Sequence, residues 1–105
     1  MTICHTTDTT FKTDLLNEGF TLVNYWAPWC GPCRMFGPIL EAYDLEKQDD
    51  MRVLKGNVDE CAETTAHYGI MTIPTTILFK DGKEIDRVIG LLSIEVLKQF
   101  ISRNK

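Results

Sequence analysis

The sequence predicts an α/β fold in which a central mixed sheet of five strands is flanked by four helices. Strand-like and helix-like patterns alternate along residues 2–69, and this alternation favours parallel strands joined by right-handed crossovers. Residues 75–90 instead have the pattern of a hairpin, which adds an antiparallel edge. The 105 residues match the usual size of one domain. We therefore expect a single domain over residues 1–105, with helices on both faces of the sheet.

The first third of the chain predicts a strand, a helix and a second strand. Residues 2–7, TICHTT, form a short strand candidate. Asp8 is suited to cap a helix that runs to about Asn17, because its carboxylate can accept hydrogen bonds from the first free N–H groups. Gly19 then ends the helical segment. The apolar run FTLVNYW at residues 20–26 predicts a buried strand.

A long helix is predicted from Cys30 to about Gln48, because apolar residues recur there at helical spacing. Pro38 lies inside this segment, and a proline within a helix removes one backbone hydrogen bond. We therefore expect a kink at Pro38, eased by the neighbouring Gly37.

A third strand and a short helix follow. Residues 51–58, MRVLKGNV, have the pattern of a strand. Asp59 or Glu60 is expected to begin a helix that ends near His67, where a basic side chain is favourable with the helix dipole.

The last third of the chain predicts a hairpin and a final helix. Two strand patterns within residues 75–90 are joined by Asp81-Gly82, a dipeptide typical of a type I′ turn. Ser93 is expected to cap the last helix through its hydroxyl. Apolar residues after Ser93 recur at helical spacing and predict that one face of this helix is buried.

The composition is that of an ordinary soluble globular protein and argues against several functions. Hydrophobic residues make up 44% and charged residues 25% of the chain. The net charge of −4 offers no basic surface for nucleic acid, and no apolar run is long enough to span a membrane. The segment MTICHTTDTTFK lacks the pattern of a signal peptide. We therefore expect a cytoplasmic protein that binds neither nucleic acid nor membranes. We also expect it to be a monomer.

Cys30 and Cys33 have the clearest chemistry among the four cysteines. Cys30 follows a predicted strand and begins a predicted helix, where unpaired N–H groups and the helix dipole stabilise a thiolate. Cys33 lies one turn further on, so both sulfurs can meet on one face and form a disulfide. Gly31 keeps the rim free of side-chain bulk, and Pro32 fits an early helical position because its missing N–H loses no partner. The pair is therefore suited to thiol–disulfide exchange.

The remaining cysteines, Cys4 and Cys61, are expected to be small buried hydrophobic residues. A secondary reactive thiol stays open for Cys61, which lies near a helix start. A closed zinc site normally has two cysteine pairs, or one pair with closely spaced histidines. Because His5 and His67 are solitary, we expect no metal site.

Taken together, these motifs resemble those of the thioredoxin family. WCGPC follows VNYWA, and GIMTIPT, FKDGK and VIG come later in that order. The resemblance covers nearly the whole chain with matching spacings. It implies the thioredoxin fold, and it implies a thiol–disulfide oxidoreductase that reduces protein disulfides through the Cys-Gly-Pro-Cys site.

The resemblance also implies roles for individual residues. Cys30 would be the exposed nucleophile and Cys33 the buried resolving thiol, and the two would form the redox disulfide. Pro74 would be a cis-proline facing the cysteines, and the backbone of Ile73 would pair with a substrate chain like an added strand. The apolar docking surface would comprise Trp29, Gly31, Pro32, Ile73, Pro74 and Gly90. Trp29 and Gly90 also fit simpler roles, as a core tryptophan and a strand-end glycine.

One residue departs from the family pattern at a buried position. Asn24 stands where most thioredoxins resembling this chain have an aspartate that is thought to accept the proton of the second cysteine. Asparagine keeps the size and hydrogen-bonding shape of aspartate but has no basic site at neutral pH. Lys55 matches a family lysine that neighbours this aspartate, and here it lacks that charge partner. We expect exchange to persist with slower deprotonation of Cys33; the alternative is that Asn24 is a tolerated isostere.

Two lesser departures lie at the rim of the site. Pro28 precedes the tryptophan of the motif, and Leu91 stands where the family often has alanine. A larger side chain beside Gly90 is expected to influence which partners dock.

The resemblance implies a protein-disulfide reductase and electron carrier with no bound cofactor. Electrons would come from a thioredoxin reductase, and the substrates would be disulfide-containing proteins. Two alternatives are a redox protein dedicated to one partner, which Asn24 suggests, and a binding scaffold in which redox chemistry is incidental.

Overall fold

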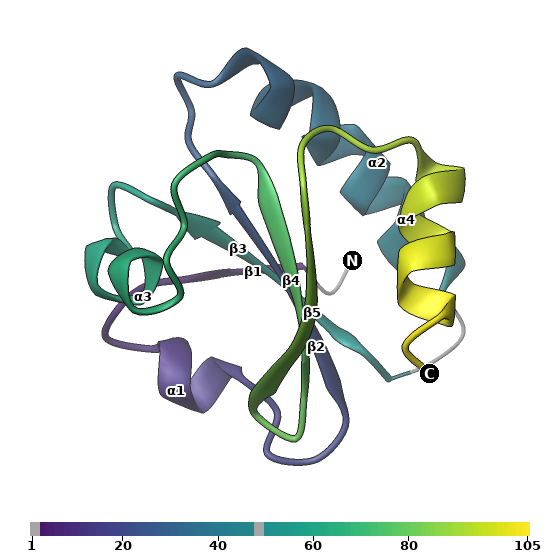
Figure 1. Ribbon diagram of the computed structural model, residues 1–105, viewed down its shortest axis with the longest axis horizontal. Coiled ribbons are helices and arrows are strands. Elements are labelled where there is room, and N and C mark those ends of the chain that lie inside the picture. The colour runs from purple at the N-terminus through teal and green to yellow at the C-terminus, as the bar shows by residue number, and fades with distance from the viewer. Residues whose placement is uncertain (1–2, 48–49) are drawn as a thin grey trace.

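The computed structural model describes residues 3–47 and 50–105, and these form one sheet with helices packed on both of its faces (Figure 1). The strands are β1 (Cys4–Thr6), β2 (Phe20–Trp26), β3 (Arg52–Asn57), β4 (Thr75–Lys80) and β5 (Lys83–Ile89). The helices are α1 (Phe11–Asp14), α2 (Gly31–Glu46), α3 (Ala62–His67) and α4 (Ile94–Ser102). The predicted order of elements is confirmed throughout the described residues.

The sheet is mixed, as predicted. Its strand order is β1-β3-β2-β4-β5. Strand β3 pairs in parallel with β1 and β2, whereas β4 pairs antiparallel with β2 and β5. The central strand β2 therefore has a parallel neighbour on one side and an antiparallel neighbour on the other, and the chain leaves β2 directly into the cysteine motif.

Alternation along β2 divides the core into two layers. Leu22 packs with Phe36 and Leu40 of α2, while Val23 and Tyr25 pack on the opposite face of the sheet. Successive side chains of a strand point to opposite faces, so Asn24 lies on the same face as Leu22. Figure 1 shows α2 and α4 on this face and α1 and α3 on the other. Asn24 therefore lies beneath the helix that begins at the cysteines.

The predicted cap of the first helix was wrong. Helix α1 spans four residues, and its N-cap is Thr10. The Asp8 carboxylate instead accepts hydrogen bonds from the backbone N–H groups of Glu63 and Thr64, at 2.9 and 3.0 Å. Asp8 therefore caps the first turn of α3, a contact between residues that lie far apart in the sequence.

The bounds of two other helices also differ from the prediction. Helix α3 begins at Ala62 with Cys61 as its N-cap, and not at Asp59 or Glu60. Helix α2 ends at Glu46 and continues without interruption through Pro38. Gln48, the predicted end of this helix, lies outside the described residues, and the kink at Pro38 stays a prediction.

The predicted turn and the last cap are confirmed. Asp81 and Gly82 have φ values of 52° and 84°, and a type I′ turn requires positive φ at both central residues. Asp81 is held further by Gly19, whose N–H donates to the Asp81 carboxylate at 2.7 Å. The Ser93 hydroxyl accepts a hydrogen bond from the Val96 N–H at the start of α4.

In the part of the chain that the structure describes, no helix is long and apolar enough to cross a membrane.

Candidate active site

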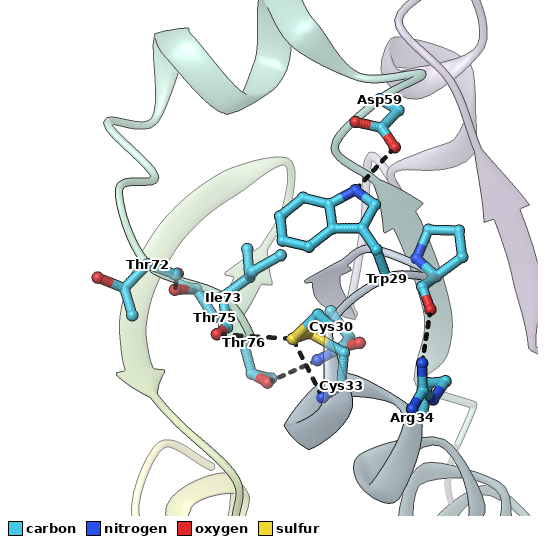
Figure 2. The surroundings of a disulfide bond; sticks show 11 residues. Trp29, Cys30, Cys33, Arg34, Asp59, Thr72, Ile73, Thr75 and Thr76 are labelled. Atoms are coloured by element: carbon cyan, nitrogen blue, oxygen red, sulfur yellow. Dashed lines mark hydrogen bonds between the residues drawn. A yellow bond between two sulfur atoms is a disulfide. The ribbon is translucent and has the colours of Figure 1, made fainter.

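Cys30 and Cys33 form a disulfide at the start of α2 (Figure 2). Their Cα atoms are 5.3 Å apart, and the Cys33 N–H donates a hydrogen bond to the Cys30 sulfur at 3.3 Å. Cys30 is the N-cap residue of the helix and has an extended backbone. The strand-to-helix junction therefore places one cysteine at the free N–H groups of the helix and the other one turn inside it.

The two sulfur-bearing residues differ in exposure. Cys30 is 8% exposed and Cys33 is 1% exposed. Pro32 occupies an early position of the helix, and a Cβ atom added at Gly31 would meet no other atom within 4 Å. The rim is thus open above Cys30, while Cys33 is closed off by protein. A nucleophile must be reachable by a substrate, whereas a resolving thiol can be buried. The exposures of Cys30 and Cys33 are compatible with those expected roles.

The segment before β4 lies against the disulfide. The peptide bond between Ile73 and Pro74 is cis, as the resemblance implied, and the Ile73 carbonyl oxygen lies 4.0 Å from the Cys30 sulfur. Figure 2 shows Ile73 directed toward the cysteines from the segment that leads into β4. The Ile73 backbone is therefore beside the sulfur that a substrate would reach.

Gly90 is hydrogen-bonded to the cis-proline. Its N–H donates a hydrogen bond to the Pro74 carbonyl at 2.8 Å, and its φ is +104°. That backbone conformation favours glycine, because a Cβ atom would be strained there. Gly90 follows the last residue of β5 and joins that end of the strand to Pro74, and its role in docking stays a prediction.

Trp29 is a surface residue and not a core tryptophan. Its side chain is 66% exposed, and its indole Nε1 donates a hydrogen bond to the Asp59 carboxylate at 3.2 Å. Trp29 directly precedes Cys30 in the chain, and Figure 2 shows its ring with the indole nitrogen turned toward Asp59. Pro28 is exposed as well, and its carbonyl accepts a hydrogen bond from the Arg34 guanidinium at 3.3 Å.

Two exposed apolar residues near the predicted docking residues in the sequence were not singled out beforehand. Met71 is 95% exposed and lies two residues before Ile73, and Ile89 is exposed directly before Gly90. Leu91, noted earlier as a departure from the family pattern, is also exposed. Adjacency to residues of the predicted docking surface was the only signal in the sequence.

Asn24, Lys55 and Thr76 form a polar row across three neighbouring strands beneath α2. Asn24 on β2 is in register with Lys55 on β3 and with Thr76 on β4. The Asn24 side chain is buried, and its amide donates a hydrogen bond to the Thr76 hydroxyl at 3.2 Å. Figure 2 shows Thr76 to one side of the two cysteines, with its hydroxyl in the hydrogen bond. The row therefore lies on the face of the sheet that α2 covers, and Asn24 stands where the family pattern would have a carboxylate.

Lys55 is half-buried in the same layer. Its ammonium lies 4.3 Å from the centroid of the Trp26 ring, a distance typical of a cation–π contact. Burial lowers the pKa of Lys55, and the negative charge of Glu41 partly opposes this shift. Trp26 packs against the small cluster formed by Ala27, Cys30 and Cys33. Lys55 is therefore linked to the disulfide through the tryptophan.

The two remaining cysteines differ from each other, and only one of them is buried as expected. Cys61 is fully buried, and its thiol donates to the Thr6 carbonyl at 3.3 Å. Burial raises the pKa of the Cys61 thiol to about 11, which argues against a reactive thiolate. Cys4 is exposed on the edge strand β1, contrary to expectation, because a short edge strand covers little of its own surface. Within the described residues no group of three or more His, Cys, Asp or Glu side chains is placed to hold a metal ion.

Comparisons with known proteins agree with this geometry. A family model described as Thioredoxin matches residues 2–103. The chain is 39% identical over 104 residues to a protein named Thioredoxin from Bacillus subtilis (strain 168), covering 99% of each chain. It is 42% identical over 99 residues to Thioredoxin from Rickettsia prowazekii (strain Madrid E), covering 93% of this chain and 94% of that protein. Together with the Cys30–Cys33 disulfide at a helix start, these matches show that the chain belongs to the thioredoxin family of thiol–disulfide oxidoreductases.

Proposed function

We propose that the chain acts as a single domain, residues 1–105, that reduces disulfides in other proteins. The observation that carries this proposal is the disulfide itself. Its more accessible sulfur, on Cys30, lies at a helix N-terminus, and its second sulfur, on Cys33, is buried one turn away. The N–H groups at that terminus favour the thiolate that attacks a substrate disulfide.

The reaction has two exchange steps. In the first, the Cys30 thiolate attacks a substrate disulfide, forms a mixed disulfide and releases one substrate thiolate. In the second, Cys33 loses its proton and attacks the Cys30 sulfur. The Cys30–Cys33 bond forms, the bond from Cys30 to the substrate breaks, and the second substrate thiolate leaves. Two electrons pass from the protein to the substrate in the complete cycle.

The apolar residues around the disulfide form the proposed docking surface. It comprises Trp29, Gly31, Pro32, Ile73, Pro74 and Gly90. The Ile73 backbone lies beside the Cys30 sulfur, so an extended substrate segment pairing with that backbone would bring its own sulfur to Cys30. The exposed indole of Trp29 supplies apolar contact area next to the same sulfur.

Electrons are proposed to come from a thioredoxin reductase, with the pyridine nucleotide held by that partner and no cofactor bound to this chain. The substrates are disulfide-containing proteins, and the compartment is the cytoplasm. A monomer suffices for this role, because both cysteines and the docking surface belong to one chain.

A second candidate is a redox protein dedicated to one partner. Asn24 favours it, because a neutral, buried amide stands where the family pattern has a carboxylate. The neutral side chain is expected to slow deprotonation of Cys33 with ordinary substrates. The disulfide of a partner that itself supplies the proton acceptor would then be reduced much faster than other disulfides.

The test is an insulin-reduction assay coupled to candidate thioredoxin reductases, with several disulfide proteins as further substrates. Similar turnover with all substrates supports a general reductase, whereas activity confined to one substrate supports the dedicated protein. A variant with Cys30→Ser and Cys33→Ser must be inactive. If its biological activity persists in cells, the chain is a scaffold and the proposal fails.

A further inference from the structure

A cavity of about 410 Å³ lies on the face of the sheet opposite to α2. It opens between α1, the end of α3 and the hairpin turn, and Figure 1 shows both helices on this face. The residues that line it are separate from the disulfide and from the proposed docking surface. Ligand sites in proteins commonly have volumes of roughly 300–1,000 Å³. The cavity is therefore large enough for a small organic molecule and takes no part in the proposed exchange reaction.

The floor of the cavity is apolar and mainly aromatic. Phe11 and Leu15 are buried there, and Tyr68 is partly buried against them. The ring centroids of Phe11 and Tyr68 are 5.9 Å apart. Both rings also pack edge-on against Phe79, at 6.0 and 5.3 Å. Aromatic rings attract further rings at such separations, so this floor is suited to a flat aromatic group.

A buried hydroxyl group lies behind this floor. The Tyr25 side chain is fully buried, and its hydroxyl makes no hydrogen bond of normal geometry with any residue that the structure describes. Burial raises the pKa of this hydroxyl, so it stays protonated and can donate. Its surroundings include Thr64 and Tyr68, which both line the cavity. A buried donor without a partner is unfavourable, so this floor favours a ligand that has acceptor atoms.

The charged groups at the cavity favour a negatively charged ligand. Lys12 lines the cavity, is exposed and belongs to none of the ion pairs formed within residues 3–47 and 50–105. The Asp8 carboxylate, also in the lining, already accepts two N–H groups at the start of α3. Glu84, whose charge acts on Tyr68, is paired with Arg87 at 2.6 Å. The nearby carboxylates therefore have partners, whereas the Lys12 ammonium is available to an anion.

We propose that this cavity binds a small aromatic carboxylate. The ring of the ligand packs against Phe11, Leu15 and Tyr68, and its carboxylate pairs with the Lys12 ammonium. Because solvent screens an ion pair at an exposed position, the pair adds only modestly to the affinity. The ring therefore supplies most of the binding, and the charge selects acids over other aromatic compounds. This site is independent of the roles proposed for Cys30 and Cys33.

The test is an NMR titration of the oxidised, isotope-labelled protein with the bicyclic acid 1-naphthoate, in which the backbone amide resonances are followed. The corresponding neutral alcohol, 1-naphthalenemethanol, and the cation 1-naphthylmethylammonium test the preference for negative charge. The variants are Lys12→Met, which removes the ammonium, and Lys12→Arg, which keeps the charge. Lys98→Met is the matched control, because Lys98 is an exposed lysine of α4 on the other face of the sheet. The same spectra report whether each variant is folded.

We expect saturable shifts at residues 8–15 and 64–68, with a Kd for 1-naphthoate of about 1 mM or lower. Lys12→Met should weaken this binding about fivefold, the upper end of what an exposed ion pair contributes. The alcohol and the ammonium compound should bind the unmodified protein at least as weakly as that, whereas Lys12→Arg and Lys98→Met should bind 1-naphthoate normally.

Three results would each overturn the proposal. The first is a titration without saturable shifts at these residues, and the second is a set of shifts centred on Trp29 and Ile73 instead. The third is equal affinity for the acid and its uncharged or cationic analogues, or for the acid in Lys12→Met and the unmodified protein, because the carboxylate would then have no role.

Discussion

Asn24 on β2 donates a hydrogen bond from its side-chain amide to the hydroxyl of Thr76 on β4, at 3.2 Å, and both side chains are buried. An amide can donate to this hydroxyl, whereas an ionised carboxylate can only accept from it. Asn24 therefore fills a donor role toward Thr76 that an ionised aspartate could not fill, and this difference can be tested by substitution at position 24.

Replacing Asn24 with aspartate should destabilise the oxidised protein at neutral pH. Burial of the new carboxyl raises its folded-state pKa above the ordinary value near ~3.9. The native state then holds the proton more tightly than the unfolded state, so the protonated form's contribution is complete below ~3.9 and is lost as pH rises through the folded pKa. We expect Asn24→Asp to cost about 1–4 kcal/mol at pH 7, with Lys55 offsetting part of it. Urea unfolding at several pH values measures this.

The same variant should reduce insulin disulfides faster, because Cys33 regains a proton acceptor. Asn24→Ala is the matched control, since it removes the hydrogen bond to Thr76 without adding a base. Equal stability of Asn24→Asp from acid to neutral pH would show that position 24 is not desolvated. Unchanged turnover would show that the proton of Cys33 leaves by another route.

Cys30 should be the first cysteine to react with iodoacetamide in the reduced protein at mildly acidic pH. It is the N-cap of α2, where free N–H groups stabilise a thiolate. Cys4 is the internal control, because it is exposed and lies on a strand. Peptide mass spectrometry of protein sampled over time gives the order of labelling. The nucleophile would be reassigned if Cys4, Cys33 or Cys61 were labelled before Cys30.

Truncating Trp29 should weaken docking far more than folding. Its side chain is 66% exposed, so Trp29→Ala is expected to change the free energy of unfolding by less than about 0.5 kcal/mol. The KM for protein disulfides should rise about tenfold, equivalent to ~1.4 kcal/mol of lost binding. Leu45→Ala is the control, since Leu45 is 71% exposed near the far end of α2. A KM no higher than that of the control would remove Trp29 from the docking surface.

Cys61 should make the protein less stable in alkali. Burial raises the pKa of its thiol from 9.0 to about 11, so the native state binds this proton more tightly than the unfolded state does. The resulting stability is complete below pH 9.0 and is lost as pH rises toward about 11. The loss should be about 2–3 kcal/mol. Urea unfolding of oxidised wild type and Cys61→Ala across this range should show their difference in stability shrinking by that amount, with Cys4→Ala behaving like wild type.

Several features of the fold and the site could be predicted because they depend on residues close together in the sequence. The type I′ turn at Asp81-Gly82 requires positive φ at two adjacent positions. The cap at Ser93 involves an N–H three residues away. The Cys30–Cys33 disulfide joins residues one helical turn apart. Thiol–disulfide exchange could therefore be predicted from the Cys-Gly-Pro-Cys motif and from the strand and helix on either side of it.

Features that depend on residues far apart in the sequence could not be predicted from local sequence patterns. Asp8 was predicted to cap the helix that follows it, but it caps α3, whose N–H groups lie 55 and 56 residues away. Cys4 and Cys61 were given the same environment, yet the first is exposed on an edge strand and the second is buried. A short polar side chain can satisfy several backbone groups, and only the packing of elements decides which of them comes within reach.

The sequence by itself determined the order of elements, the reactive cysteine pair and the neutral residue at position 24. The tertiary structure alone decided what surrounds that residue. Pairing of β2 with β3 and β4 brings Lys55 and Thr76 to either side of Asn24, and the packing of α2 places the ammonium beside Gly37, one turn from Cys33. Electrostatic effects fall off with distance and depend on burial, so which charges lie near Asn24 and the start of α2 is decided by the folded chain.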